Sequence, residues 1–209
     1  LVQGVIAGGY DALYKAAEAS EDNREAGTKD LQARGLLPID SVIGIAASGG
    51  TPYTNGAVEY ARNLGCFTVG LTCVPDSLIT KTAEHAIVPV VGPEPITGST
   101  RMKSGTSHKL ILNMISTVCM IRLGYVKGNR MTNVKASNIK LKERSLRILM
   151  SETGLDEEAA KSLMNKASED LRVALVMFRA NVDAETANQA LGESDFVVER
   201  AVESVTRSV

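Results

Sequence analysis

Short apolar runs alternate with helical patterns along much of this chain, and this alternation limits the folds that it can adopt. The apolar runs are residues 41–46, 67–72 and 85–91, with a similar run at residues 1–7. Strands that are apolar along their whole length, rather than at every second position, are typical of a parallel sheet covered on both faces. Helices between such strands indicate right-handed crossover connections. The sequence therefore predicts an α/β fold in which a parallel sheet is flanked by helices on both faces.

Proline and glycine mark the ends of the clearest predicted helix. Pro52 is well suited to a first helical turn, and the pattern then continues to residue 64 and ends at Gly65. The other predicted helices of this part of the chain cover residues 9 to about 19, a charged stretch ending near Gly35, residues 75–84, and a long apolar stretch after Gly105.

The composition changes at residue 151, where short amphipathic patterns replace the alternation. We expect helices within residues 153–167 and 183–202, with capping groups from Thr153, Gly154 and Asp183. The sequence thus predicts two domains, residues 1–150 and residues 151–209, the second being a small helical segment. Because the chain opens at Leu1 in a strand pattern, we also expect that an N-terminal portion of the first domain is missing from it.

Charge and hydropathy argue against several classes of partner. The chain has 23 Lys and Arg residues against 24 Asp and Glu residues, for a formal net charge of −1. No basic field therefore favours nucleic acid or an acidic membrane surface. Residues 110–126 form the longest apolar stretch, but polar residues interrupt it. This pattern indicates a buried core helix rather than a membrane span.

The cysteines point to a reducing setting. Cys66, Cys73 and Cys119 are odd in number and are spaced for neither a zinc site nor a set of disulfides. A cytoplasmic location fits this pattern best. No cluster of histidines and carboxylates suggests a metal.

Two loops rich in small and hydroxyl residues precede predicted helices. Ser48, Gly49 and Thr51 lie in the first loop, after the predicted strand at residues 41–46. Ligands of open α/β sheets bind beyond the carboxyl ends of the strands, and the free N–H groups at a helix N-terminus favour a phosphate. An ordinary glycine turn with a Ser or Thr cap explains the first loop equally well when it is taken alone.

The second loop, residues 98–106, gathers more donors. Ser99 and Thr100 supply hydroxyls, and Lys103 supplies a compact positive charge suited to a phosphate. This density favours contact with a ligand over a plain connection. The two loops together predict a phosphate site at one edge of the sheet.

A carboxylate near a bound sugar phosphate would be able to act as a general base. Glu18 and Glu21 are three residues apart and share a face if a helix continues through them. From residue type alone, a solvated helix end is the simpler interpretation. His108 follows the second loop in the next helix, where surface exposure is the simpler expectation and ligand contact the alternative.

Longer motifs carry a family resemblance. IAASGGTPYTNGAVEYARNLG, ITGSTRMKSGTSHKLILNMIST and GNRMTNVKASNIKLKER resemble the N-acetylmuramic acid 6-phosphate etherases, which are sugar-isomerase (SIS) domain enzymes of peptidoglycan recycling. The similarity covers nearly the whole chain. GSTRMKSGT is specific to these etherases and to the related glucokinase regulatory proteins, whereas NRMTNVKASN favours the etherases.

The resemblance implies a fold, an activity and a site. The fold would be a flavodoxin-like three-layer sandwich around a five-stranded parallel sheet, with a C-terminal segment similar to ubiquitin-associated (UBA) domains. The enzyme would be a homodimeric lyase, without metal or nucleotide, that yields N-acetylglucosamine 6-phosphate and D-lactate. Glu21 matches one catalytic carboxylate. The phosphate would be held by Ser48, Gly49, Thr51, Ser99, Thr100 and Lys103.

Two departures from the family pattern accompany these matches. The family's other catalytic glutamate precedes the part of the sequence that this chain contains. The family commonly has an arginine where Gly50 stands, so a cation is absent although the backbone donors remain.

Two other function classes remain open from the residues. One is a non-catalytic phosphosugar-binding regulator of the glucokinase regulatory protein type, and the other is an aldose–ketose isomerase. Glu21 favours a catalyst, and the regulators carry two tandem SIS domains, whereas 209 residues accommodate one.

Overall fold

The computed structural model describes residues 2–15, 17, 19–133 and 138–207. The chain divides into two compact units, Leu1–Asn113 and Met114–Val209. Helix α4 (Lys103–Arg122) contributes to both units. The predicted domains, residues 1–150 and 151–209, stay a prediction, and their boundary lies within α5 (Ile139–Thr153).

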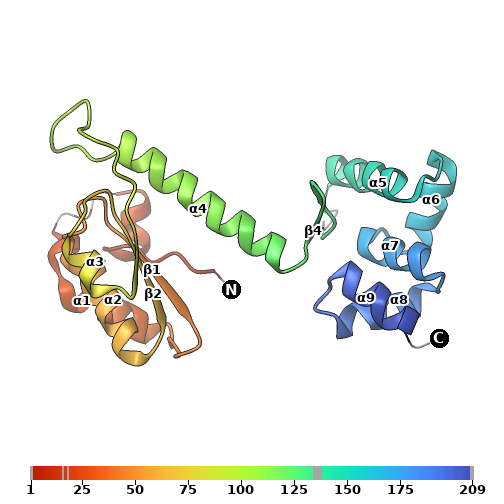
Figure 1. Cartoon of the computed structure of the whole chain (residues 1–209), viewed down its shortest axis with the longest axis horizontal. Coiled ribbons are helices and arrows are strands. Elements are labelled where there is room, and N and C mark those ends of the chain that lie inside the picture. The colour runs from red at the N-terminus through yellow and green to blue at the C-terminus, as the bar shows by residue number, and fades with distance from the viewer. Residues whose placement is uncertain (1, 16, 18, 134–137, 208–209) are drawn as a thin grey trace. The chain divides into compact units, whose positions relative to one another are not determined.

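The first unit contains the parallel sheet that the apolar runs predicted (Figure 1). Its strands, in spatial order, are β1 (Ser41–Ile45), β2 (Phe67–Leu71) and β3 (His85–Ile87). The pairing register sets Ser41 opposite Phe67 and Val69 opposite His85. The prediction of an α/β fold with parallel strands is therefore confirmed, although β3 is shorter than the apolar run at residues 85–91.

The remaining elements of this unit are the 3₁₀ helices η1 (Gly9–Leu13) and η2 (Ser20–Asp22), and the α-helices α1 (Arg24–Ala33), α2 (Pro52–Leu64) and α3 (Leu78–Thr82). Helix α2 begins at Pro52 and ends where Gly65 adopts a left-handed conformation, as predicted. It packs against β1 and β2, and α1 packs against α2. The close approach of α1 to α2 depends on Gly27, because a Cβ there would lie 2.1 Å from the carbonyl oxygen of Tyr53.

The N-terminal prediction is wrong in two respects. Residues 2–6 form no regular strand, and the expected helix over residues 9–19 is reduced to the 3₁₀ helix η1. A strand needs a neighbour that accepts and donates its backbone hydrogen bonds, and none of the described segments pairs with residues 2–6. Gly8 and Gly9 both have positive φ angles, which an α-helix does not contain, so the chain forms only the short 3₁₀ helix η1 here. Residues 1, 16 and 18 of these predicted elements lie outside the described residues.

The second unit is built mainly of helices, with a short antiparallel hairpin. The hairpin joins β4 (Val126–Lys127) to β5 (Arg130–Met131), and the helices after α5 are α6 (Glu157–Lys166), α7 (Leu171–Ala180), α8 (Ala184–Glu193) and α9 (Val198–Arg207). Asp183 caps α8 by accepting a hydrogen bond from the amide of Thr186, as predicted. Gly154 ends α5 in a left-handed conformation, and the N-cap of α6 is Asp156 rather than Thr153 or Gly154.

Leucines from α5, α7 and α8 form the centre of this second unit. Leu149, Leu171 and Leu175 are fully buried, and Leu191 is nearly so. Burial of a leucine side chain stabilises a fold by about 1.5–3 kcal/mol, so these helices hold one another in place. The nearly buried carboxylate of Glu152 adds a polar cross-link, because it accepts hydrogen bonds from Arg130 and Arg179.

Candidate active site

The loop after β1 has a conformation that only glycine adopts easily. Gly49 has a φ angle of 72° and is buried. A Cβ at this position would lie 2.1 Å from Oγ of Ser77 and 2.9 Å from Oγ1 of Thr72. The backbone of the first loop can therefore approach the loop after β2 only because residue 49 lacks a side chain.

Hydrogen bonds from three elements fix this first loop. The buried side-chain amide of Asn55, in α2, donates to the carbonyl oxygens of Gly49 and Thr51 at 3.2 and 2.9 Å. The amide of Ile79, in α3, donates to the carbonyl oxygen of Gly49 at 3.0 Å. From the loop after β2, Thr72 Oγ1 donates to the carbonyl oxygen of Ala47 at 3.2 Å. The loop is therefore preorganised before any ligand binds.

The start of α2 leaves donors available to a ligand. Thr51 is the N-cap residue, yet its side chain makes no capping hydrogen bond. The first N–H groups of a helix have no partner within it, and the helix dipole adds positive charge there. Ser48 is exposed, and its Oγ accepts a hydrogen bond from the amide of Gly50 at 3.3 Å. The hydroxyl-bearing residues Ser48 and Thr51 therefore lie between the end of β1 and the start of α2.

Glu21 approaches this space from the N-terminal segment. It lies in η2, which packs against α2. Ala19, just before η2, has a φ angle of 61°, so the chain makes a left-handed turn before Glu21. Glu21 itself is exposed. Glu18, the other carboxylate considered from the sequence, lies outside the described residues.

A cavity of about 470 Å³ brings together residues from the three predicted segments. Glu21, Ser48, Thr51 and Thr100 all line it. Its wall also includes backbone and side chains of residues 5–7 and 45–47, together with Ala12, Ala17, Tyr53 and Thr54. Glu21, the first loop and Thr100 of the second loop thus line the same cavity.

The second loop contributes less to this cavity than the sequence suggested. Ser99 and Lys103 are not among the residues that line it, and neither is Gly49. The ammonium group of Lys103 instead donates to the carbonyl oxygen of Pro93 at 2.7 Å. The side chain of Lys103 is exposed, so it has room to take another direction.

The carboxylate of Glu94 lies at the N-terminus of α4, where we predicted from the sequence that an anionic ligand would bind. Its carboxylate accepts hydrogen bonds from the amides of Lys103 and Ser104, both at 3.0 Å. These hydrogen bonds lower the pKa of Glu94 below its ordinary value. Sequence reasoning missed this residue, as it missed Asn55 and Thr72. A carboxylate ahead of a helix start was the available signal for Glu94, since acidic groups stabilise that end of a helix.

Tyr53 lines the cavity, but its hydroxyl is hydrogen-bonded to a residue of α1. Its hydroxyl donates to Oδ2 of Asp30 in α1. Burial and this hydrogen bond raise the pKa of Tyr53 far above its ordinary value, so the phenol keeps its proton at neutral pH. Tyr53 is therefore a fixed wall of the cavity rather than an acid–base group.

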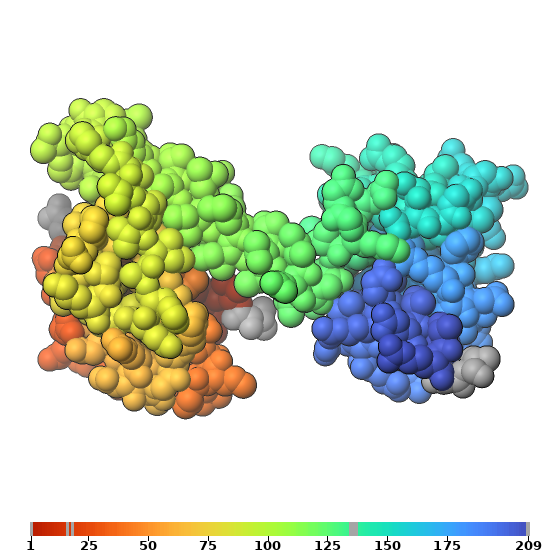
Figure 2. Space-filling model, viewed as in Figure 1, coloured from red at the N-terminus to blue at the C-terminus, as the bar shows by residue number. Residues whose placement is uncertain are grey.

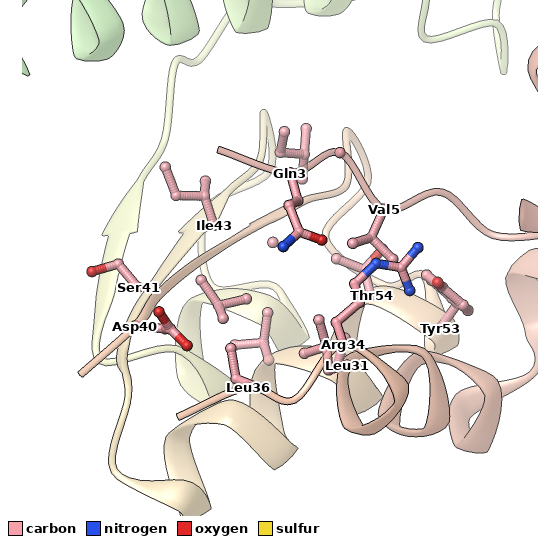
Figure 3. Close-up of a pocket in the computed structure, with 16 residues that line it drawn as sticks. Gln3, Val5, Leu31, Arg34, Leu36, Asp40, Ser41, Ile43, Tyr53 and Thr54 are labelled. Atoms are coloured by element: carbon pink, nitrogen blue, oxygen red, sulfur yellow. The ribbon is translucent and has the colours of Figure 1, made fainter. Parts of the chain in front are cut away.

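A second cavity, of about 350 Å³, lies beside β1 (Figure 3) and shares Val5, Ile45, Tyr53 and Thr54 with the cavity that contains Glu21. Its lining includes Val5, Leu31, Leu36 and Ile43, with Arg34 and Asp40 as the charged members. Most of these side chains are apolar, and the figure shows them coming from the N-terminal segment, α1, β1 and α2. Its carboxylate, Asp40, accepts a hydrogen bond from the amide of Leu37, and neither Glu21 nor the predicted phosphate-binding residues line this cavity, so it is not the candidate active site.

His108 is buried, so the expectation that it would be exposed is wrong. Its side chain packs against the loop after β2, with Nε2 3.4 Å from Sγ of Cys73. Across the described part of the chain, no three His, Cys, Asp or Glu residues are grouped so as to hold a metal ion. In the same residues no helix is both long and apolar enough to cross a membrane.

Comparison with known proteins identifies the family. Over 207 residues the chain is 47% identical to N-acetylmuramic acid 6-phosphate etherase 1 of Bacillus licheniformis, a match that covers 99% of this chain and 68% of the relative. The chain belongs to the N-acetylmuramic acid 6-phosphate etherase family. The etherase of Pectobacterium atrosepticum is 48% identical over 202 residues, covering 97% of this chain and 67% of the relative.

A third etherase and a domain model agree with this assignment. The etherase of Symbiobacterium thermophilum is 52% identical over 182 residues, covering 87% of this chain and 60% of the relative. Residues 1–62 match the model of the glucokinase regulatory protein N-terminal SIS domain. The predicted membership of the etherase family is thereby confirmed, and the SIS match agrees with the parallel sheet and with the first loop.

Proposed function

We propose that the protein is a carbon–oxygen lyase that cleaves the lactyl ether of N-acetylmuramic acid 6-phosphate. The products are N-acetylglucosamine 6-phosphate and D-lactate. The observation that carries this proposal is the cavity that places Glu21 with Ser48, Thr51 and Thr100. Family membership supports the choice of substrate, because the relatives are named for this etherase activity.

The proposed chemistry is an elimination followed by an addition. The aldehyde at C1 of the open-chain sugar acidifies the proton at C2, and a carboxylate removes it. Lactate then leaves from C3 as an alkoxide that takes up a proton, and water adds to the resulting double bond. Glu21 supplies one of the two carboxyl groups that these proton transfers require. Among the described residues that line the cavity, Glu21 is the one carboxylate.

The phosphate of the substrate would bind at the start of α2. Ser48 and Thr51 offer hydroxyls there, and the helix dipole favours the negative charge. The amide of Gly49 donates to the carbonyl oxygen of Ala46 at 2.9 Å, so Gly49 would shape the loop around the phosphate. Thr100 and Ser99 would add hydroxyls from the second loop. Lys103 would exchange its hydrogen bond to the carbonyl oxygen of Pro93 for one to the phosphate. Because this chain has Gly50 where the family commonly has an arginine, Lys103 is the positively charged residue among the proposed phosphate-binding residues.

The number of strands in the complete sheet and the type of C-terminal segment are also part of the proposal. We place β1, β2 and β3 in a larger, five-stranded SIS sheet with helices on both faces. The open edge of β1 and the largely apolar cavity of Figure 3 support this placement, because an added strand and helix would cover them. We assign residues 151–209 to a UBA-like segment, which agrees with the packing of α7 against α6, α8 and α9.

The enzyme would act as a homodimer in the cytoplasm. Helix α4, the green segment of Figure 2, supports the dimer, because apolar side chains are exposed along it. These side chains are Leu110, Met114, Val118, Met120 and Ile121. Exposed apolar surface on this scale is typical of an interaction site. The free thiols of Cys66, Cys73 and Cys119 support a reducing compartment.

A lactate-release assay tests the function directly. The protein, in the length in which the cell makes it, should release D-lactate from N-acetylmuramic acid 6-phosphate and far less from the unphosphorylated sugar. A phosphosugar-binding regulator would bind N-acetylmuramic acid 6-phosphate without releasing lactate, and that result would overturn the proposal. An isomerase would instead interconvert an aldose and a ketose phosphate without breaking the ether.

A further inference from the structure

Cys73 and His108 form a close pair beside the candidate active site. Cys73 lies in the loop after β2, and His108 lies in α4. Sγ of Cys73 is 3.4 Å from Nε2 of His108 and 3.7 Å from Oγ of Ser107. The thiol therefore faces two groups that can accept its proton. Neither Cys73 nor His108 lines the cavity that contains Glu21.

The imidazole is the better acceptor of the two. His108 is only 8% exposed, and this burial lowers its pKa below the ordinary value of 6.5. The ring is therefore a weaker base than a free imidazole, but it is still a far stronger base than a neutral hydroxyl. At neutral pH the ring is therefore uncharged, and when its proton is on Nδ1, Nε2 carries a free lone pair. The hydroxyl of Ser107 donates its proton to the carbonyl oxygen of Ser104 at 2.9 Å. Ser107 is a weaker base and is also slightly farther from the sulfur.

We propose that Cys73 is a modification site, a thiol that reacts with small electrophiles while His108 accepts its proton. With an alkyl halide such as iodoacetamide, the sulfur forms a bond to carbon, iodide leaves, and the proton passes to Nε2. With a hydroperoxide, the sulfur attacks the distal oxygen and the O–O bond breaks. The sulfur is then oxidised by two electrons to a sulfenic acid, and the released oxygen takes up the proton.

The other two cysteines lack this arrangement. Cys66 is buried and its thiol donates to the carbonyl oxygen of Leu37 at 3.2 Å. Burial raises the pKa of Cys66, which disfavours its reactive thiolate. Cys119 is exposed, and no histidine contact is recorded for it among the described residues. Cys73 is partly exposed, so a small reagent can reach it.

A group added to Cys73 would disturb the first loop. The amide of Cys73 donates to the carbonyl oxygen of Ala47 at 3.0 Å, beside Ser48. His108 and Ser107 occupy the space around the sulfur, so a modified side chain has to push the loop after β2 away from α4. This consequence rests on the proposed function, because it predicts weaker binding of the phosphosugar after modification.

Peptide-resolved mass spectrometry with iodoacetamide at neutral pH tests the modification site. We expect Cys73 to be alkylated at least about tenfold faster than Cys66, and about tenfold faster in the wild type than in His108→Gln. Ser107→Ala is the matched control and should leave the rate within about twofold. Circular dichroism melts establish that each variant is folded. Equal Cys73 rates in the wild type and in folded His108→Gln, or a Cys73 rate no higher than that of Cys66, would overturn the proposal.

A second experiment tests whether modification of Cys73 weakens binding of the phosphosugar. Alkylated wild-type enzyme should show a raised KM for the phosphosugar, whereas Cys73→Ala treated in the same way should not. Unchanged kinetics of the alkylated enzyme would overturn the link to the first loop. Because the labelling rates need no catalytic activity, an absence of lactate release from untreated enzyme would count against the proposed function alone.

Discussion

The buried side-chain amide of Asn55 donates a hydrogen bond to the carbonyl oxygen of Gly49, 3.2 Å away. Asn55 lies in the first turn of α2, and Gly49 lies in the loop that leads into the same helix. The helix therefore fixes the conformation of the loop at its own N-terminus. This loop is the part of the candidate site that we expect to hold the phosphate.

Asn55→Ala should weaken both the fold and the site. The carbonyl oxygens of Gly49 and Thr51 each lose a donor, and a small void replaces the amide. We expect the free energy of unfolding to fall by about 1–3 kcal/mol and KM for the phosphosugar to rise. Denaturant unfolding and lactate-release kinetics measure the two effects. Asn63→Ala, at an exposed position of α2, is the control, and equal effects from both variants would contradict the role of Asn55.

Gly49→Ala should damage the first loop, whereas Gly50→Ala should not. A Cβ at Gly49 meets Oγ of Ser77 at 2.1 Å, and the positive φ angle adds strain. A Cβ at Gly50 has Oγ of Ser48, at 3.9 Å, as its nearest neighbour. We expect a loss of roughly 1–3 kcal/mol of stability for Gly49→Ala alone, measured by thermal unfolding. If the neighbouring Gly50→Ala were just as harmful, the steric argument would be wrong.

Glu21→Gln should lower kcat by about two orders of magnitude or more, the scale of a lost general acid or base. Binding of the phosphosugar should change little, because the amide keeps the size of the carboxyl group. Asp22→Asn is the matched control, since Asp22 is also in η2 but does not line the cavity. Lactate release by both variants measures the difference. Undiminished turnover in Glu21→Gln would remove Glu21 from the mechanism.

The cap on α4 should depend on pH. Hydrogen bonds from the amides of Lys103 and Ser104 lower the pKa of Glu94 below 4.5, its ordinary value. A depressed carboxyl pKa contributes stability that is complete above the pKa of the unfolded chain and is lost as the pH falls through the folded pKa. The wild type should therefore melt at a higher temperature than Glu94→Gln at pH 7. This difference should shrink below about pH 4.5, and a difference that stays constant down to pH 3 would exclude the cap.

Val118→Glu should shift the protein from dimer to monomer. Val118 is 53% exposed on α4 among other exposed apolar side chains, and a carboxylate at an apolar interface is costly to bury. Sedimentation velocity over a range of protein concentrations measures the change. Asn129→Glu, at an exposed position in the β4–β5 hairpin, is the control. A Val118→Glu protein that still sediments as the wild type does would move the interface away from α4.

Features that depend on near neighbours in the chain could be predicted well. Pro52 and Gly65 mark the two ends of α2 because each residue restricts or frees its own backbone angles. The runs that became β1 and β2 were visible because a buried strand needs apolar side chains on both faces. Asp183 was correctly predicted as a cap for the same local reason.

Features that depend on distant partners could not be predicted in this way. Residues 2–6 have a strand-like sequence but form no strand, because backbone pairing requires a second segment at the right place. His108 was expected at the surface and is instead buried against Cys73, which precedes it by 35 positions. Glu94 accepts hydrogen bonds from the amides at the start of the helix where we expected a phosphate, and only the fold of residues 94–103 brings its carboxylate to those amides.

The sequence by itself determined the elements, the residue types at the site and the family, because these follow from local backbone preferences and from motifs that can be read in order. Only the tertiary structure decided which of those residues line the same cavity. Glu21, Ser48 and Thr100 line one cavity, whereas Lys103 is directed toward Pro93. The physical reason is that side-chain direction depends on how loops pack against helices and strands far away in the chain, and a linear pattern of residue types does not contain that information.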